Sequence, residues 1–164
     1  AYQEELTNYL ALIEDLERRI VAATKEIKRQ LKPDPRATLL MTLPAVGHLT
    51  AYLLLNEIGD VKRFPAPGKL CAYGGIVPIV RQSADHRWQG HITKEGNRYI
   101  RWTLTEVACK APSKDYALGI FYRRLQARRG NLKARVAVAR KLLVAVWYVL
   151  TYEEPYKPTP FPTV

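Results

Sequence analysis

The sequence predicts a mainly α-helical protein, in which a long N-terminal helix precedes one compact helical domain. Residues 2–31 repeat apolar side chains at alternating spacings of three and four positions. Residues 96–111, 114–129 and 131–151 each carry apolar residues at helical spacing. Only residues 76–93 combine Ile, Val and Thr with polar interruptions, which is typical of short strands. With 164 residues and 48% hydrophobic composition, the chain is long and apolar enough for one such domain.

The N-terminal segment, residues 1–33, has the pattern of a coiled-coil helix. Its seam positions are occupied by Leu6, Tyr9, Ile13, Leu16, Ile20, Ala23, Ile27 and Gln30. Leu10 and Leu12 widen the apolar face, so a long helix packed on its own domain is the alternative. Pro33 and Pro35 end the helix. We expect residues 1–33 to form a homo-oligomer, and because Ala1 already lies within the helical pattern we expect a longer parent protein.

The compact domain is expected over residues 36–152. Its first elements are a short helix at 36–42, a tight hairpin at 43–47, a helix at 48–57 and a short helix at 66–73. Leu49, Leu53 and Leu54 are expected on the inner face of the helix at 48–57. A small β-hairpin or an irregular loop at 76–93 leads into the three later helices. Residues 153–164 are rich in proline, which predicts an extended, poorly ordered tail.

The charge balance predicts a polyanionic partner. Twenty-six Lys and Arg residues against fifteen Asp and Glu residues give a formal net charge of +11. Such a surplus favours nucleic acid most often and an anionic membrane surface less often. The sequence carries neither a secretory signal nor an uninterrupted apolar run of membrane-spanning length. We therefore expect a cytoplasmic protein with no membrane partner.

The cysteines and histidines do not predict a disulfide framework or a metal site. Cys71 and Cys109 both fall in predicted apolar helices, so we expect two buried, reduced thiols. His48, His86 and His91 have no cysteine or carboxylate at ligand spacing.

Ser83 is the candidate nucleophile of this chain. It is reached through Gly74-Gly75 and Pro78, which permit a sharp change of direction and then stiffen the chain. The cationic residues around it in the sequence are Arg81, Arg87, Lys94, Arg98 and Arg101. Arginine matches phosphate oxygens in a two-pronged geometry, so this setting suits a phosphate substrate. The alternative is a polar turn serine beside surface arginines.

Two further segments are candidate phosphate contacts. Residues 43–47 resemble a helix-hairpin-helix corner, whose glycines let backbone N–H groups, here those of Val46 and Gly47, approach a phosphate. Ala45 occupies the first glycine position, and an ordinary corner between helices is the alternative. Before the helix at 96–111, Thr93 and Asn97 are plausible caps, and Lys94 and Asn97 are placed to hold an anion.

Two tryptophans, Trp88 and Trp102, bracket this basic stretch, and either could stack on a base. An aromatic residue near a helix is more often part of the core, which is the interpretation we favour. Phosphodiester chemistry usually recruits Mg²⁺ through clustered carboxylates. Asp85 and Glu95 are too few to form such a site near Ser83, so any metal ligands must come from elsewhere.

Six motifs follow one another in the chain: Leu43-Pro-Ala-Val-Gly-His-Leu-Thr-Ala51, Glu57-Ile-Gly59, Arg63-Phe64, the Gly75, Pro78 and Ser83 spacing, Gly90-His-Ile-Thr-Lys-Glu-Gly-Asn-Arg98, and Ala137-Val-Ala-Arg-Lys-Leu-Leu143. Together they resemble the C-terminal transposase region of the insertion-sequence 110/116/902 recombinases, a family related to the Piv invertase. The resemblance covers about residues 36–150, and the preceding helix resembles the family's coiled-coil linker. Ala45 and Ala84 depart from the pattern, because each stands where the family commonly has glycine.

The resemblance implies a transposase of the prokaryotic cytoplasm that recombines DNA. Ser83 would be the nucleophile, giving a covalent phosphoserine link to a cut strand, while Mg²⁺ would be held by an acidic cluster of a RuvC-like N-terminal domain that this chain lacks. Arg81 and Arg87 would position the phosphate, and Lys94, Asn97, Arg98 and Arg101 would contact the backbone nearby. The implied partners are DNA, other subunits and, for some members, a structured bridge RNA.

Two other classes of function stay open. One is a non-catalytic nucleic-acid-binding and oligomerisation module in which Ser83 only caps a turn. The other is a bare dimerisation domain whose charge serves solubility. On the recombinase interpretation, we still expect this chain alone to bind nucleic acid without cutting and rejoining DNA.

Overall fold

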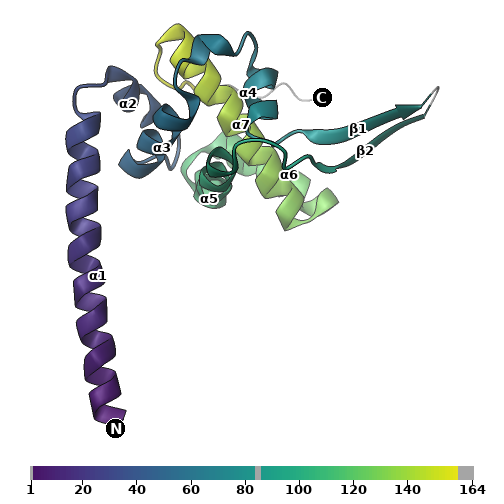
Figure 1. Cartoon of the computed structure of the whole chain (residues 1–164). Coiled ribbons are helices and arrows are strands. Elements are labelled where there is room, and N and C mark those ends of the chain that lie inside the picture. The colour runs from purple at the N-terminus through teal and green to yellow at the C-terminus, as the bar shows by residue number, and fades with distance from the viewer. Residues whose placement is uncertain (1, 84–85, 159–164) are drawn as a thin grey trace. The chain divides into compact units, whose positions relative to one another are not determined.

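The computed structural model describes the backbone of residues 2–83 and 86–158, and the side chains of residues 80–89 lie outside the described part. The chain divides into two compact units, residues 1–34 and 35–164. The first unit is the helix α1, Tyr2–Leu31 (Figure 1). Its bounds confirm the predicted helix at 2–31, which ends before Pro33.

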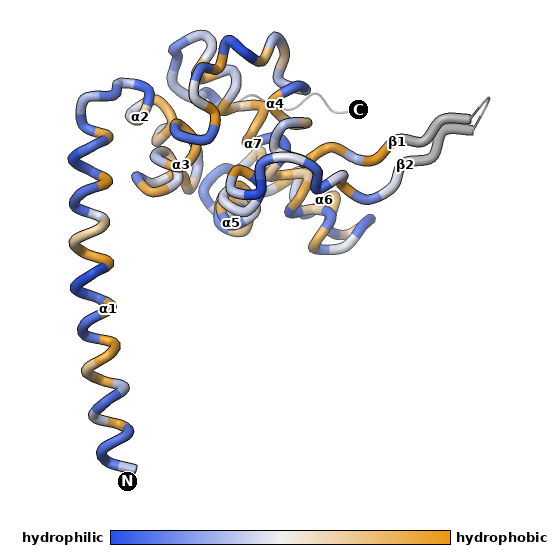
Figure 2. The backbone as a smooth tube through the Cα atoms, viewed as in Figure 1, coloured by the Kyte–Doolittle hydropathy of each residue, from blue (hydrophilic) through white to orange (hydrophobic). Residues whose placement is uncertain are grey.

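The apolar seam of α1 is exposed along most of its length. Leu6, Tyr9, Ile13, Leu16 and Ile20 are all exposed. Figure 2 shows hydrophobic positions recurring along α1 between hydrophilic ones. An exposed apolar stripe of this kind is typical of a helix that binds another helix. Self-association through α1 stays a prediction.

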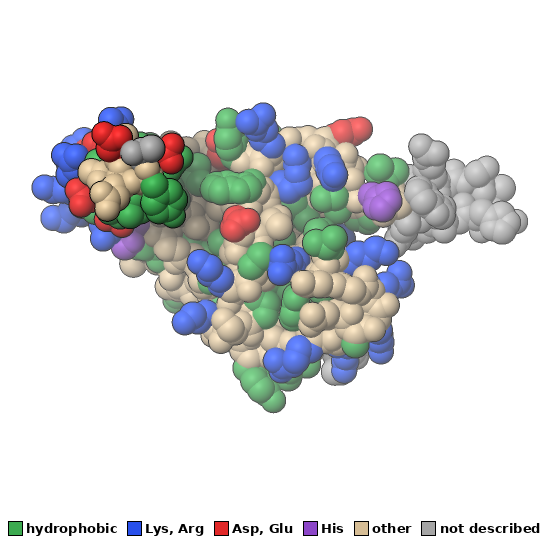
Figure 3. Space-filling view, turned by 90° about the horizontal axis from the view of Figure 1, so that it is seen from below, with side chains coloured by type: hydrophobic (Ala, Val, Ile, Leu, Met, Phe, Trp, Pro, Cys, Tyr) green, Lys and Arg blue, Asp and Glu red, His purple; other side chains and the backbone are tan. Residues whose placement is uncertain are grey.

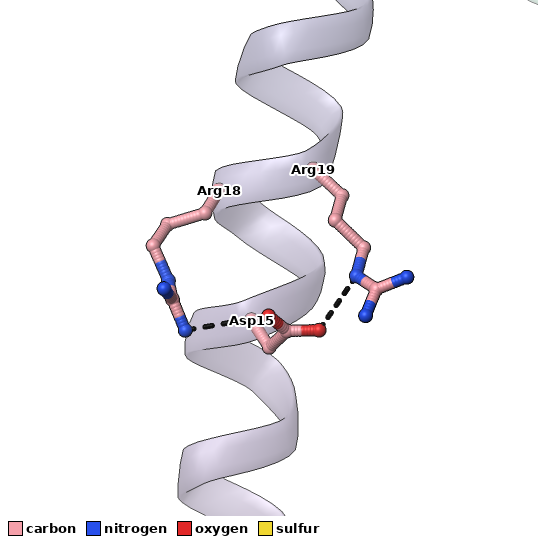
Figure 4. Close-up of polar contacts among 3 residues, drawn as sticks. All are labelled: Asp15, Arg18 and Arg19. Atoms are coloured by element: carbon pink, nitrogen blue, oxygen red, sulfur yellow. Dashed lines mark hydrogen bonds and ion pairs between the residues drawn. The ribbon is translucent and has the colours of Figure 1, made fainter.

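Ion pairs within α1 support its helical conformation. Asp15 accepts hydrogen bonds from Arg19 Nε at 2.6 Å and from Arg18 Nη2 at 3.3 Å (Figure 4). Residues three and four positions apart are neighbours on a helix, so one carboxylate can accept hydrogen bonds from two arginines. Further along, hydrogen bonds from Arg29 and then Gln30 lower the pKa of Glu26 to about 2.

The second unit contains the other helices and the hairpin (Figure 1). Its elements in chain order are α2 (Pro35–Leu40), α3 (His48–Ile58), the 3-10 helix η1 (Val61–Arg63), α4 (Pro67–Tyr73), β1 (Pro78–Ser83), β2 (His86–Ile92), α5 (Arg98–Lys114), α6 (Tyr116–Arg129) and α7 (Asn131–Tyr152). The predicted mainly helical class and the order of elements are confirmed. The 3-10 turn η1 is an addition that the sequence pattern does not predict.

Helix α7 is the centre of the core. It contacts α2, η1, α4, α5 and α6. Its buried side chains include Leu143, Val146 and Trp147, which belong to the apolar residues at helical spacing in the predicted helix at 131–151. The Trp147 indole Nε1–H donates to the Phe64 carbonyl at 2.9 Å, which links α7 to the chain just after η1.

The burial of α3 and of one cysteine differs from what the sequence predicted. Leu49 is exposed, and Leu55 and Ile58 are buried on α3 in its place, because the buried face of this helix is rotated from the predicted one. Cys109 is exposed, whereas Cys71 is buried as expected. Burial raises the pKa of the Cys71 thiol and so favours its neutral form.

Strands β1 and β2 form an antiparallel hairpin in the segment where strands were predicted. Their register pairs Pro78 with Ile92 and Ser83 with His86, with an irregularity between Pro78 and Val80. The main contact of each strand is the other strand, and Figure 1 shows the hairpin extending away from the helices. A lone two-stranded hairpin is marginally stable in water, so its root in the helical body determines how well it is held.

Part of the proline-rich tail binds the helical body, which its composition does not predict. The Tyr156 N–H donates to Thr42 Oγ1 at 2.8 Å, and the Tyr156 hydroxyl donates to Asp115 Oδ2 at 3.0 Å. Burial and the adjacent Asp115 carboxylate raise the pKa of Tyr156. Residues 159–164 of the tail lie outside the described residues. Among the residues that are described, no helix is both long and apolar enough to cross a membrane.

Candidate nucleic-acid interface

The hairpin leaves the helical body at its root, which is where the segment before β1 and the segment after β2 cross close to each other. The Thr93 N–H donates to the Val77 carbonyl at 2.9 Å, and the Asn97 N–H donates to the Tyr73 carbonyl at 2.7 Å. These bonds bring the segment after β2 against the segment before β1. The direction of the hairpin is therefore set by backbone groups on both sides of it.

Glycines make this close crossing possible. Gly75 has φ +65° and Gly96 has φ +126°, conformations that L-residues with side chains avoid. A Cβ on Gly96 would lie 2.3 Å from the Tyr73 carbonyl oxygen, and one on Gly75 would lie 2.8 Å from the Glu95 carbonyl oxygen. Both positions therefore require glycine for space as well as for backbone conformation.

Asn97 and Arg101 anchor the crossing to α5. Asn97 Oδ1 accepts hydrogen bonds from the N–H groups of Tyr99 and Ile100, which confirms Asn97 as the cap of this helix. Its amide nitrogen donates to the Glu57 carboxylate on α3. The half-buried Arg101 donates from Nη1 to the Gly74 carbonyl at 3.3 Å. Thr93, the other candidate cap, does not cap α5.

A second group of side chains supports the same region from the side of α3 and α4. The Arg63 guanidinium lies 4.6 Å from the ring centres of both Phe64 and Tyr73. Arg63 Nη2 also donates to the Glu57 carbonyl at 3.3 Å. Hydrogen bonds from Asn97 and Arg63 hold the pKa of Tyr73 below its ordinary value. Glu57, Arg63 and Asn97, which belong to three separate motifs of the sequence, thus meet in one cluster.

The corner between α2 and α3 has one strained residue. Ala45 has φ +62°, so it does not keep an ordinary backbone conformation despite its side chain. The Val46 N–H donates to the Leu43 carbonyl at 3.2 Å. Gly47 is the N-cap of α3 and is extended, and it supplies no side-chain acceptor for the first N–H groups of that helix. The N-terminus of α3 thus presents main-chain donors, as a helix start generally does.

Ala45→Gly is expected to stabilise the protein, because glycine adopts the left-handed conformation without the steric cost of a Cβ. Glycine also raises the conformational entropy of the unfolded chain, which offsets part of this gain. We expect the free energy of unfolding to rise by about 0.5–1 kcal/mol in total. Urea unfolding monitored by tryptophan fluorescence would measure it. Ala127→Gly, the same substitution at an exposed position inside α6, should instead cost about 1 kcal/mol. A loss of stability on Ala45→Gly would contradict the strain argument.

The central candidate, Ser83, is the last residue of β1, and its register partner is His86. Arg81 pairs with Trp88, and Arg87 pairs with Gln82, so both arginines also belong to the hairpin. The side chains of these residues lie outside the described part of the chain, as does Ala84 altogether. The backbone therefore places Ser83, Arg81 and Arg87 together on the β1–β2 hairpin, which is called the arm below.

Four of the other predicted site residues lie at or near the root of that arm. Lys94 and Arg98 are exposed, whereas Arg101 and Asn97 are half-buried and bonded within the chain. Val46 and Gly47 belong to the separate corner before α3.

Helices α5, α6 and α7 carry most of the positive charge of the second unit. Residues 98–152 contain twelve Lys and Arg residues but only Glu106 and Asp115 as acids. Asp115 is buried, where it caps α6 by accepting from the Leu118 N–H at 2.9 Å. Figure 3 shows Lys and Arg side chains spread over one face of the second unit, with few acidic ones among them. Such a surface attracts a polyanion.

Trp102 is exposed, so our preference for a core position was wrong. Neighbouring Tyr99 is exposed as well, and the Arg98 guanidinium lies 5.2 Å from its ring centre. The sequence pattern could have revealed this, because the buried α5 residues Ile100, Leu104 and others occupy a different helical face from Tyr99 and Trp102. Within the described residues, no group of three or more His, Cys, Asp or Glu side chains lies together as potential metal ligands.

The second unit is thus a mainly helical domain with a basic face and a β-hairpin whose two ends pack closely at Gly75 and Gly96. The model of the transposase IS116/IS110/IS902 family matches residues 37–123, and the chain belongs to that family.

Several proteins of known sequence are similar to this chain. One is a probable family 20 transposase of Pseudomonas aeruginosa, which is 28% identical over 89% of this chain and 44% of its own length. The transposase for insertion sequence element IS1111A of Coxiella burnetii is 29% identical over 81% of this chain and 38% of its own length. The pilin gene-inverting protein of Moraxella bovis is 32% identical over 74% of this chain and 38% of its own length. The chain thus spans less than half the length of each of these relatives.

Proposed function

We propose that this chain is the serine-bearing part of a DNA transposase or site-specific recombinase, and that Ser83 attacks a DNA phosphodiester. The observation that carries the proposal is the placement of Ser83 on a hairpin arm rooted in a basic helical body, in a chain of a transposase family. The transposases and the pilin gene-inverting protein among its relatives support DNA as the substrate.

In the proposed step, Ser83 Oγ loses its proton and forms a bond to the phosphorus. The bond from phosphorus to one deoxyribose oxygen breaks, and that oxygen leaves as a hydroxyl after taking up a proton. The phosphoserine link conserves a phosphodiester, so attack by the hydroxyl of another strand end can release the serine and rejoin DNA. A serine hydroxyl needs activation or stabilisation of the developing charge, which suits a cationic setting.

The cations of the arm and its root have complementary roles in this proposal. Arg81 and Arg87 position and neutralise the attacked phosphate, while Lys94 and Arg98 contact the adjoining backbone from the start of α5. The internal bonds of Asn97 and Arg101 favour a supporting role, in which both hold the root of the arm and Arg101 adds positive potential. The Gly47 N–H provides a further backbone contact before α3, whereas the Val46 N–H is bonded to the Leu43 carbonyl and supports the corner.

The described carboxylates of this chain do not fit a Mg²⁺ site, and the step above uses only the chain's own residues. Mg²⁺, expected from the family resemblance, would be held by a RuvC-like acidic domain outside this chain. The seam of α1 would bring subunits together, so that the acidic domain of one could meet the serine of another. A structured guide RNA is a further proposed partner of the basic surface.

Ser83→Ala in the full-length protein is expected to abolish the covalent protein–DNA adduct, because no other atom at that position can accept the phosphate. Denaturing gel electrophoresis of the protein with its end-labelled DNA would show the adduct, and mass spectrometry would place the phosphate on Ser83. DNA affinity should stay nearly unchanged, since the cations are intact. Ser113→Ala, at an exposed serine of α5, is the matched control and should form the adduct normally. An adduct that survives in Ser83→Ala would reject the catalytic role and leave a binding module.

A further inference from the structure

The start of α5 exposes two large aromatic rings on one face. The exposed fractions of Tyr99 and Trp102 are 48% and 56%. Residues three apart on a helix are neighbours, so the two side chains emerge next to each other. Tryptophan is highly buried on average, and a pair of exposed rings of this size is the kind of surface that proteins use for contact.

The charges around these rings indicate which kind of partner they fit. Between residues 94 and 110 the basic side chains are Lys94, Arg98, Arg101 and Lys110, and the acidic ones are Glu95 and Glu106. Arg98 lies over the Tyr99 ring, so a cation and an aromatic face are presented together. A stacking ring beside cations is the combination that binds nucleotides, whose bases offer flat faces and whose phosphates are anionic.

The position of the rings relates them to the hairpin. Arg101, next to Trp102 in the chain, donates to the Gly74 carbonyl at the root of the arm. Asn97, which caps α5 just before Tyr99, is bonded at the same root to the Tyr73 carbonyl. The ring pair therefore lies within one or two helical turns of the place where the arm leaves the body.

We propose that Tyr99 and Trp102 form a stacking surface for unpaired bases of nucleic acid next to the hairpin. This inference rests on the proposed action of the hairpin on nucleic acid. Bases within a duplex already stack on one another and present no free faces, so the surface selects unpaired nucleotides. Glu106 lies one turn beyond Trp102 and bounds the surface at that end, so the phosphates lie toward Lys94 and Arg98.

Fluorescence anisotropy of the 164-residue chain with three labelled probes tests the proposal. The probes are oligothymidylate about 15 nucleotides long, an abasic strand of the same length and a duplex of that length. Trp102→Ala is expected to weaken binding of oligothymidylate about tenfold and to leave binding of the abasic strand and the duplex nearly unchanged. Trp102→Phe should keep most of the affinity, because phenylalanine still offers a ring. Tyr116→Ala, which removes an exposed ring at the start of α6, is the matched control and should bind all three probes normally.

Equal weakening for all three probes, or none for oligothymidylate, would overturn the stacking surface. If Trp102→Ala instead changes the sedimentation coefficient of the free chain while oligothymidylate affinity is unchanged, the rings form a protein interface and the proposal is wrong. Circular dichroism confirms that each variant is folded. The stacking surface is read out by probe affinity and the serine chemistry by the covalent adduct of the full-length protein, so a failure of one is distinguishable from a failure of the other.

Discussion

Gly96→Ala is expected to destabilise the second unit severely, by about 3 kcal/mol or more, because two costs coincide at this position. The φ of +126° is a conformation that alanine rarely adopts, and the new Cβ would lie 2.3 Å from the Tyr73 carbonyl oxygen. That oxygen belongs to the backbone at the end of α4 and accepts from the Asn97 N–H, so it cannot move away alone. Urea unfolding would give the loss in free energy, and amide hydrogen exchange would show whether the hairpin root opens first.

Gly68→Ala is the matched control for this substitution. Gly68 lies inside α4, and a Cβ there would meet nothing within 4 Å. Alanine favours a helix over glycine, so we expect a gain of up to about 1 kcal/mol. If Gly96→Ala were as stable as Gly68→Ala, the crossing described for the hairpin root would be wrong.

Trp147→Ala is expected to cost about 3–5 kcal/mol, since it leaves a cavity in the centre of the helical core. Trp147 is 8% exposed, and its indole N–H supplies the hydrogen bond to the Phe64 carbonyl. Trp147→Phe should retain part of the packing but leave that carbonyl without its donor, at a cost of about 1–3 kcal/mol. Urea unfolding followed by far-ultraviolet circular dichroism would rank the two variants without relying on the tryptophan signal.

Trp102→Ala provides the comparison within the same residue type. Because Trp102 is more than half exposed, its removal should change the free energy of unfolding by only about 0.5 kcal/mol. The alanine variant at Trp147 should therefore lose stability, whereas the one at Trp102 should lose affinity for unpaired nucleotides. Similar losses of stability at both positions would contradict the burial on which this contrast depends.

The helices could be predicted from the sequence because their signals are local. The apolar spacing of α1 and α7, the two prolines after α1 and the cap at Asn97 each lie within a few residues of the element that they specify. The β-hairpin was also placed in its segment, although its root was not. Apolar spacing indicates that a helix has a buried face, but its exact rotation depends on neighbours, which is why Leu49 was placed wrongly. Trp102 was placed wrongly for a different reason, because the general preference of aromatic residues for the core was followed instead of the spacing of Ile100 and Leu104.

The site depends on contacts that local patterns cannot show. Asn97 meets Glu57 forty positions earlier, and Trp147 meets the Phe64 carbonyl eighty-three positions earlier. Charge and polarity predicted Asn97 and Arg101 as phosphate contacts, and the structure adds the partners that both have within the chain, which sequence patterns do not show. The motif residues Glu57 and Arg63 were noticed only for their resemblance, and the fold supplies their physical role at the hairpin root.

Over the described residues, the main contacts of the hairpin are between its own strands, and its two ends join it to the helical body. Residues 78–92 could be exchanged for those of a relative, or lengthened, while the helices around α7 keep every one of their mutual contacts. Chimaeras joined at the two segments that flank the hairpin would then take on the nucleic-acid preference of the relative that donates the hairpin, and the helical body of the recipient would stay intact.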